Sequence, residues 1–431
     1  MASTTNAPTT ESSKPKAFSI AIAGGGISGL TLALGLLKYE HIDVQIYEAA
    51  PAFGEIGAGV AIGPNSQRAL KLIGPHARDA FDKHATSNMW EAYADVFTEH
   101  IVGAGEHEGE AFASQKTQGG MRSVHRAQFL DELVKGVPAE RAHFNKRLQS
   151  TEEKEGGGVF LHFKDGTTAT ADAVVGADGI HSTIREYLLG ERDMAAHSVF
   201  AGSVAYRGLI PMDKAVEKLG AEYAQNSMML CGPGKAILSY PTDLGKIMNA
   251  VVIDFERPDW DSDKWIMPAT SEQLNRLLSG WGKKAHGLIE LLDSPSLTAW
   301  AMRDDLPAST YAIGPVAMMG DAAHASTPFQ GQGAGQAIED ALVLETLLGR
   351  VHDPKHIPNA FAAYDQVRRP RSQRVVKTSR EAGELFGMMA KGVGSDLKKI
   401  AEQADTRMHW IWNRDLEKQN GEAIALFEES L

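Results

Sequence analysis

The first strong pattern along the chain is an apolar run, a glycine turn and an apolar helix. Residues 18–23 are mostly apolar, which predicts a buried strand. A glycine triplet at 24–26 ends this run, and residues 27–38 then place apolar side chains at helical spacing. Another short strand is predicted at 44–47. Two strands joined by a helix form a βαβ unit, which requires a parallel sheet.

The middle of the chain changes to consecutive strands without intervening helices. Several strands are predicted between 198 and 256, and this pattern favours a mainly antiparallel sheet in a second domain. A buried strand at 316–319 and a long helix at 334–348 return to the first pattern. We therefore expect an α/β fold in which a Rossmann-like domain carries an inserted antiparallel domain. The expected parts are the Rossmann-like domain at 17–195 and 294–358, the inserted domain at 196–293, and a C-terminal helical region at 359–431.

Three segments are interpreted from their composition. Residues 1–16 are rich in Ser, Thr and Pro, which predicts a disordered tail. Residues 100–120 are rich in Gly, Glu and His and are expected to form an exposed loop, although part of 80–120 could join the inserted domain. The basic cluster at 368–380 is interpreted as a solvated helix face, and the alternative is a face that attracts a nucleotide phosphate.

Charge and cysteine content exclude several classes of function. The net charge of -12 argues against a nucleic-acid partner, because such partners need a basic surface. The single cysteine, Cys231, excludes an intramolecular disulfide and a CxxC redox pair. No metal site is predicted. No apolar run is long enough to cross a bilayer, so we expect no membrane partner and a cytoplasmic location.

The glycine turn carries a motif with a clear chemical meaning. Gly24-x-Gly26-x-x-Gly29 stands between a predicted strand and helix, which is the context of a dinucleotide site. Gly24 permits the tight turn, Gly26 lets a pyrophosphate approach the backbone, and Gly29 lets helix and strand pack closely. Glu48, at the end of the next predicted strand, stands where a ribose-binding carboxylate belongs. This motif alone does not distinguish NAD from FAD.

Two later motifs extend the pattern. Asp178-Gly179 follows one predicted strand, and Gly320-Asp321 follows another and runs into a glycine-rich stretch at 331–335. In order and spacing, the three motifs resemble the fingerprints of the class A flavoprotein monooxygenases, the aromatic hydroxylase family. The resemblance implies a domain of the glutathione-reductase and para-hydroxybenzoate-hydroxylase type, bound FAD, and NADH or NADPH as cosubstrate.

The resemblance also assigns roles around the flavin. Asp321 would accept a hydrogen bond from the ribityl chain, and Asp178 belongs to the motif tied to FAD and NAD(P)H. Gly333 and Ala334 open the long helix, whose positive end would stabilise negative charge on the reduced flavin. An alternative for Asp321 is a helix N-cap.

Two further positions resemble family residues beside FAD. Residues 57–61, which include Gly59 and Ala61, resemble the segment that passes beside the isoalloxazine ring and the adenosine. Arg126, predicted to open a helix, resembles the family arginine that reaches FAD, and its alternative is a surface ion pair.

Candidate substrate-binding residues lie on predicted strands of the inserted domain. Arg207 and Tyr240 resemble the substrate-contacting Arg and Tyr of hydroxylases in this family. Arg207 would hold a carboxylate or phenolate, and Tyr240 would hydrogen-bond the same oxygen. The alternatives are a structural ion pair for Arg207 and a packed strand aromatic for Tyr240.

Within the family, residues 54–66 and 325–340 are most similar to the salicylate hydroxylases. Phe329 stands where many relatives carry histidine, and Asp304-Asp305 stands where many carry Asp-Arg. The implied reaction inserts one atom of O2 through a flavin hydroperoxide and converts salicylate to catechol with loss of carbon dioxide. Alternatives are another hydroxybenzoate, a hydroxynicotinate or a phenolic aldehyde as substrate, an FAD oxidase or epoxidase, and a non-catalytic flavin-binding protein. A homodimer is possible.

Overall fold

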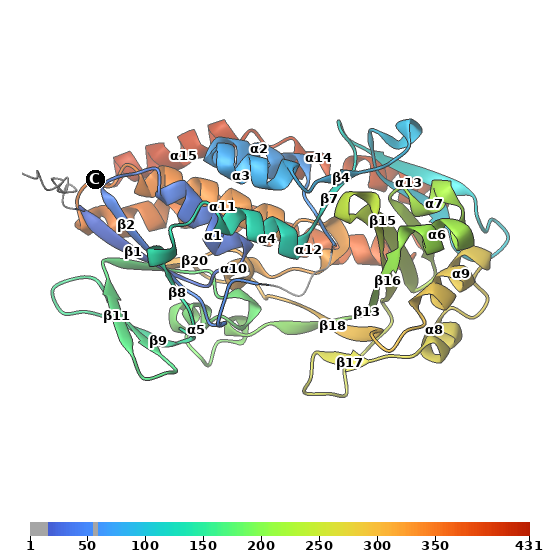
Figure 1. Cartoon of the computed structure of the whole chain (residues 1–431), viewed down its shortest axis with the longest axis horizontal. Helices are drawn as coiled ribbons and strands as arrows, with labels where there is room; N and C mark the ends of the chain where they lie inside the picture. Colours follow the sequence, from blue (N-terminus) through green and yellow to red (C-terminus); the bar gives the residue numbers. More distant parts are fainter. Residues whose placement is uncertain (1–15, 55–58) are drawn as a thin grey trace, which may run out of the picture.

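The computed structural model describes residues 16–54 and 59–431, and two large sheets organise this part of the chain (Figure 1). Apart from Lys16, the tail expected at 1–16 lies outside the described residues, as do Gly57 and Ala58 of the segment expected beside the flavin. The predicted α/β class is confirmed. No helix among the described residues combines the length and apolarity that a membrane crossing needs.

The first sheet has the strand order β19-β20-β12-β1-β2-β8. Neighbouring strands are parallel except in the β19–β20 hairpin. The central strands are short and almost fully buried, as expected for a parallel sheet covered on both faces. The strands are β1 (Phe18–Ala23), β2 (Ile42–Tyr47), β8 (Ala142–His143), β12 (Ala173–Gly176), β19 (Ala312–Ile313) and β20 (Val316–Met318).

Helices cover one face of this sheet, and a small antiparallel sheet with helix α5 covers the other (Figure 1). The helix α11 packs against α1, α2, α12 and α15, and is buried along almost its whole length. The helices are α1 (Ile27–Leu36), α2 (Pro64–Ile73), α3 (Pro75–Asp82), α4 (Arg126–Val134), α5 (Thr183–Leu189), α11 (Gly333–Leu348), α12 (Ile357–Phe386) and α15 (Leu416–Glu429). The small sheet contains β9 (Leu148–Glu153), β10 (Val159–Phe163) and β11 (Thr168–Ala171).

The second sheet has the strand order β17-β18-β13-β16-β15-β14-β5-β6. It is antiparallel except for the β14–β5 pair, which agrees with the mainly antiparallel sheet predicted. The strands are β5 (Val96–Val102), β6 (Ala111–Lys116), β13 (Val199–Pro211), β14 (Met228–Gly232), β15 (Lys235–Thr242), β16 (Ile247–Asp254), β17 (Ile266–Pro268) and β18 (Thr298–Asp304).

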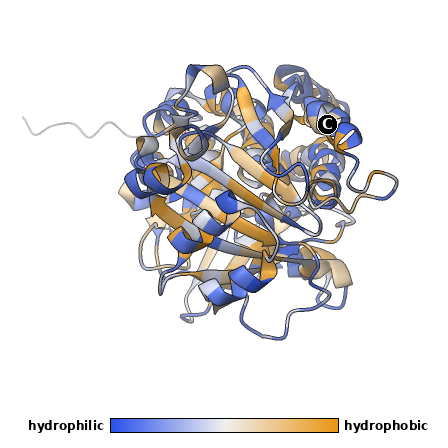
Figure 2. Ribbon diagram, turned by 90° about the vertical axis from the view of Figure 1, so that its right-hand side faces the viewer, coloured by the Kyte–Doolittle hydropathy of each residue, from blue (hydrophilic) through white to orange (hydrophobic). Residues whose placement is uncertain are grey.

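Side chains of this sheet alternate between two environments. One face packs on a helical layer that contains α6 (Met212–Leu219), α7 (Ala221–Ala224), α8 (Ser271–Leu277) and α9 (Lys283–Leu292). The other face looks toward the first sheet and the C-terminal helices, including α13 (Leu397–Thr406), which packs on β6. Figure 2 shows hydrophobic strands through the centre of the molecule and hydrophilic colours on its outer helices and loops.

The remaining elements are short. A separate three-stranded sheet has the order β3 (Gly59–Ala61), β7 (Arg122–His125), β4 (Thr86–Ser87). Two single-turn helices, α10 (Asp321–His324) and α14 (His409–Trp412), flank the region described next.

The exposed loop expected at 100–120 is wrong where two strands enter that segment. Strand β5 continues to Val102 and β6 spans Ala111–Lys116, so loops form only between these strands and after β6. The reason is tertiary, because β5 pairs with β14, which lies far along the sequence. The polar side chains of β5 therefore lie on a face of the second sheet and not in solvent.

Candidate active site

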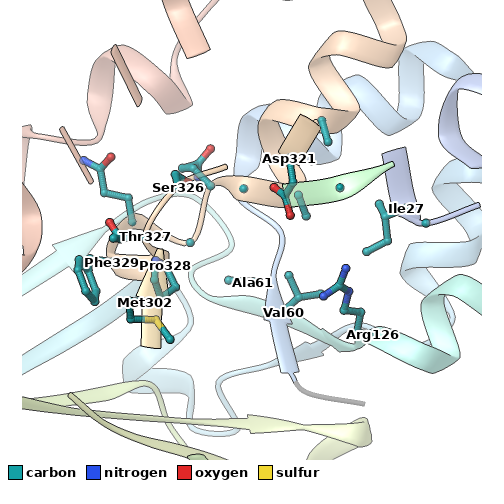
Figure 3. Close-up of a pocket in the computed structure, with 18 of the residues that line it drawn as sticks. Ile27, Val60, Ala61, Arg126, Met302, Asp321, Ser326, Thr327, Pro328 and Phe329 are labelled. Atoms are coloured by element: carbon teal, nitrogen blue, oxygen red, sulfur yellow. The ribbon is translucent and has the colours of Figure 1, made fainter. Parts of the chain in front are cut away.

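A continuous cavity of about 580 Å³ extends from the glycine turn after β1 to the inner face of the second sheet. The volume falls within the usual range for small-molecule sites. All the residues predicted to bind a cofactor except Gly29, which packs behind the turn, line this cavity, and so do Arg207 and Tyr240. Figure 3 shows Asp321, Arg126, Ala61 and Phe329 around it.

The glycine turn has the close contacts that its sequence predicts. Gly24 has φ +109°, and a Cβ there would lie 2.3 Å from the Ala177 carbonyl oxygen. A Cβ on Gly29 would lie 2.0 Å from the Gly24 carbonyl oxygen, so helix α1 can approach the turn only with glycine at this position. Gly26 is the N-cap of α1 and provides no side-chain cap, which leaves the first N–H groups of the helix directed at the cavity.

Glu48 holds the turn in place. Its carboxylate accepts hydrogen bonds from the backbone N–H groups of Gly25 and Ala50, each at 2.7 Å. Each carboxylate oxygen can accept a further hydrogen bond, and Glu48 lines the cavity. This geometry is compatible with binding of ribose hydroxyls.

The start of α11 brings a second helix N-terminus to the cavity. Gly333 is the first residue of this helix, and the N-cap, Gln332, provides no side-chain cap. A Cβ on Gly333 would lie 3.9 Å from Asp321 Oδ1, so the Asp321 carboxylate and this helix start are close neighbours. Asp321 is the first residue of α10, whose N-cap is Gly320, so the N-cap alternative for Asp321 is wrong.

Asp178 is turned toward its own loop. Its carboxylate accepts hydrogen bonds from Ser182 Oγ at 2.5 Å and from the Thr183 N–H at 2.8 Å. Burial raises the pKa of Asp178, and these hydrogen bonds act in the opposite direction. Asp178 therefore shapes the cavity wall through the segment that leads into α5.

Arg126 is the first residue of α4, as predicted, and its side chain extends toward Val60 (Figure 3). Gly59 and Ala61 are the ends of β3, which pairs with β7 directly before Arg126. A Cβ on Gly59 would lie 2.9 Å from the Tyr240 ring, so this strand and the second sheet meet at the cavity.

These features fit FAD. Two helix N-termini face the cavity and suit the pyrophosphate and the electron-rich edge of the flavin. Two carboxylates, Glu48 and Asp321, line the cavity and could accept hydrogen bonds from hydroxyls of a bound FAD. The glycines keep the backbone accessible, because side chains at Gly24 or Gly59 would collide with neighbouring atoms.

Arg207 and Tyr240 lie on the sheet face that closes the other side of the cavity. The Tyr240 hydroxyl donates a hydrogen bond to the Gly59 carbonyl oxygen at 2.8 Å. Burial raises the pKa of Tyr240 to about 12, although nearby Arg207 acts to lower it, so the phenol stays protonated at neutral pH. The Arg207 guanidinium lies 5.5 Å from the centre of the Trp300 ring. Among the described residues, no carboxylate lies within ion-pair distance of Arg207.

The two departures from the family pattern have structural partners. Phe329 packs edge-to-face on Phe255 with 5.0 Å between ring centres, and both rings form part of the cavity wall. Asp304 is fully buried and binds Arg380 through both oxygens. Asp305 pairs with Arg185 at 3.2 Å, and burial raises the pKa of Asp305 to about 7.

The prediction of a solvated helix face at 368–380 is wrong for Arg368 and Arg371, which bind buried carboxylates. Arg368 is fully buried and binds Asp340 at 2.8 Å and Glu339 at 2.6 Å. Arg371 binds Glu339 at 2.7 Å. Although burial raises it, the Arg368 and Arg371 guanidiniums hold the pKa of Glu339 at about 2.

This buried charge cluster also binds the turn next to Asp321, which lines the cavity. Asp340 accepts hydrogen bonds from the Gly320 N–H at 3.0 Å and from His324 at 2.5 Å. Gly320 directly precedes Asp321, so the cluster orients the turn that presents Asp321. The spacing of charges in α11 gave no indication of this role.

Two polar residues of the substrate end were not predicted. His100 on β5 and Arg407 at the end of α13 both line the cavity. His100 falls in the segment interpreted as a loop, and Arg407 comes from a C-terminal region without a recognised motif. Only the packing of α13 on β6 brings them together.

Comparison with known proteins agrees with this geometry. Residues 17–379 match the family described as FAD binding domain, and the chain belongs to this family. It is 50% identical over 415 residues to 6-methylsalicylate 1-monooxygenase of Aspergillus terreus, with 95% of this chain and 92% of that protein covered. It is 39% identical to a salicylate hydroxylase of Pseudomonas putida, with 94% of each chain covered. A solved salicylate hydroxylase substrate complex is similar, with a TM-score of 0.85, 35% identity, and 96% of this chain and 98% of that chain covered.

The chain is therefore an FAD-dependent monooxygenase of the salicylate hydroxylase type, with NAD(P)H as cosubstrate. The predicted cofactor, enzyme class and fold type are confirmed.

Proposed function

We propose that this enzyme hydroxylates salicylate, or a ring-methylated salicylate, at the carboxyl-bearing carbon. Salicylate, O2, NADH and two protons would give catechol, carbon dioxide, water and NAD⁺. The observation that carries the proposal is a cationic side chain, Arg207, close to Tyr240 and next to apolar side chains of the cavity wall. The names of the relatives, which refer to salicylate and 6-methylsalicylate, support this substrate class.

When bound, FAD would take a hydride from NAD(P)H and activate O2 for insertion into the ring. The chain's own residues bind and orient the substrate. Arg207 would hold its carboxylate or phenolate, and favour the electron-rich phenolate form by its charge. Tyr240 remains protonated, and its hydroxyl lies between the substrate wall and Gly59 on β3. The apolar side chains of Leu238, Val251 and Met302 exclude water.

The direct test is substrate-stimulated NADH and NADPH oxidation by the purified holoenzyme. Salicylate and 6-methylsalicylate are expected to accelerate oxidation and to yield catechol and methylcatechol, identified by chromatography. Hydroxynicotinates, other hydroxybenzoates and phenolic aldehydes are measured in parallel. Stimulation by one of these compounds alone would overturn the proposed substrate, and the absence of labelled oxygen from ¹⁸O2 in the product would overturn hydroxylation.

Replacing Arg207 by alanine is expected to raise the KM for salicylate by about 10-fold to 100-fold, the range for a lost charged hydrogen bond. The flavin content should not change, because Arg207 lies on the sheet opposite the glycine turn. Steady-state kinetics and the flavin absorbance of the purified variant measure both. Loss of FAD from this variant would instead show a structural role for Arg207.

A further inference from the structure

The start of α11 is held by a side chain of α2. Asn65, the second residue of α2, is fully buried. Its Nδ2 donates hydrogen bonds to Gln332 Oε1 at 3.1 Å and to Glu339 Oε1 at 2.7 Å. Gln332 is the N-cap of α11, and Glu339 lies seven residues further along the same helix, so both are on one helix face. One amide therefore connects the N-terminus of α11 to a point about two turns further on.

The charge of Glu339 fixes the orientation of both amides. Arg368 and Arg371 bind the Glu339 carboxylate at 2.6 Å and 2.7 Å. Although burial acts to raise it, the pKa of Glu339 stays at about 2 because of these cations, so the carboxylate can only accept hydrogen bonds. The Asn65 atom that faces it must be the nitrogen, and the Gln332 atom that faces this nitrogen must be the oxygen. A buried network that begins on α12 thus sets the side chain of Gln332.

This contact keeps the Gln332 side chain away from its own helix. Gln332 provides no side-chain cap for α11, and the next two residues, Gly333 and Ala334, line the cavity. The N–H groups of a first helical turn are free of partners within the helix and carry a partial positive charge that acts over a short range. Its effect on a bound flavin therefore depends on where the first turn of α11 lies.

Gly63 leaves room for the two amides on the side of α2. A Cβ on Gly63 would lie 2.9 Å from Gln332 Nε2 and 3.0 Å from Asn65 Oδ1. Its φ is −68°, which any residue can adopt, so the lack of space and not backbone strain favours glycine here. Gly335 is equally close to α2, because a Cβ there would lie 2.3 Å from Ser66 Oγ. The starts of α2 and α11 are therefore in close contact at two points.

We propose that Asn65 is a positioning residue for the flavin, which through Gln332 fixes the N-terminus of α11 and thereby raises the reduction potential of bound FAD. Reduced flavin carries more negative charge than oxidised flavin, so a fixed positive helix end stabilises the reduced form more. Bound FAD is needed for this effect but no particular aromatic acid is, so its absence would leave the proposed substrate unaffected.

The test is the two-electron reduction potential of the purified holoenzyme, measured by dye equilibration without aromatic substrate. Asn65→Leu keeps a similar volume and removes both hydrogen bonds of the amide. It is expected to weaken the preference for reduced over oxidised FAD by about 3-fold to 10-fold, which lowers the potential by about 15–30 mV. Gly63→Ala keeps Asn65 but displaces the ends of both amides, so it should lower the potential in the same direction.

Asn420→Leu is the matched control, because Asn420 binds the opposite end of the same helix. Its Nδ2 donates a hydrogen bond to Thr346 Oγ1 at 2.9 Å, and Thr346 lies in the last turn of α11. This change should alter the preference for reduced FAD by less than about twofold, which corresponds to about 10 mV. FAD content and unfolding midpoint are measured for each variant, so that loss of cofactor is not mistaken for a change in potential.

The outcomes separate positioning from a general structural role. A wild-type potential in FAD-loaded Asn65→Leu would overturn the inference, and so would an equal decrease in Asn420→Leu, which would indicate general loosening of α11. If Asn65→Leu does not retain FAD, Gly63→Ala decides, and an unchanged potential in that variant overturns the inference. Salicylate-stimulated NADH oxidation by the wild-type enzyme tests the proposed function separately.

Discussion

Replacing Arg368 by methionine is expected to lower the free energy of unfolding by about 3–5 kcal/mol. Arg368 is fully buried and neutralises Glu339 and Asp340, which are also fully buried. Methionine fills similar space but leaves part of this negative charge uncompensated. Because typical domains are stable by only about 5–15 kcal/mol, the loss is a large fraction of the total. Urea unfolding of the FAD-saturated protein, followed by circular dichroism, measures it.

Arg369→Gln is the matched control, since it removes the same charge from the next position of the same helix. Arg369 pairs with Asp365 at 2.7 Å, and 30% of its side chain is exposed. Its loss should change the free energy of unfolding by no more than about 0.5 kcal/mol. Equal shifts for the two variants would show that the buried charge cluster does not stabilise α11 and α12.

Replacing Gly29 by alanine is expected to reduce FAD affinity by about 10-fold to 100-fold. The new Cβ would lie 2.0 Å from the Gly24 carbonyl oxygen, so α1 must move away from the turn. Such overpacking costs about 1–3 kcal/mol, and the displacement withdraws the helix N–H groups from the pyrophosphate position. Titration of the apoprotein with FAD, monitored by flavin fluorescence, gives the affinity.

Gly421→Ala serves as the comparison, because Gly421 also lies within a helix but a Cβ there meets nothing within 4 Å. This change should leave FAD affinity unaltered and stabilise α15 by about 0.5–1 kcal/mol. Undiminished FAD affinity in Gly29→Ala would mean that the close contact at the turn is not required for cofactor binding.

The cofactor half of the site could be predicted from the sequence because its determinants are local. Gly24, Gly26 and Gly29 lie within six residues of each other, and a tight turn between a strand and a helix needs glycine at such positions. Asp321 likewise comes shortly after strand β20 and opens α10, and Gly333 opens α11. Short-range steric requirements of this kind are visible in the order of residues alone.

The substrate half depends on contacts between distant parts of the chain. The cavity-lining residues Arg207, Tyr240 and His100 lie on β13, β15 and β5, and the order of these strands along the sheet differs from their order in the sequence. The segment with His100 resembled a loop because the pairing of β5 with β14 is not encoded near it. Arg407 reaches the same place only because α13 packs on β6.

The sequence by itself determined the βαβ unit and the FAD motifs, since each is defined by neighbours within one or two elements, while Arg207 and Tyr240 were predicted from a family resemblance. Tertiary structure alone decided that Arg368 is buried and that Arg407 and His100 line the cavity. The physical reason is that burial and charge pairing are properties of packed surfaces. A basic helix has the same sequence pattern whether its charges meet water or meet Glu339 and Asp340.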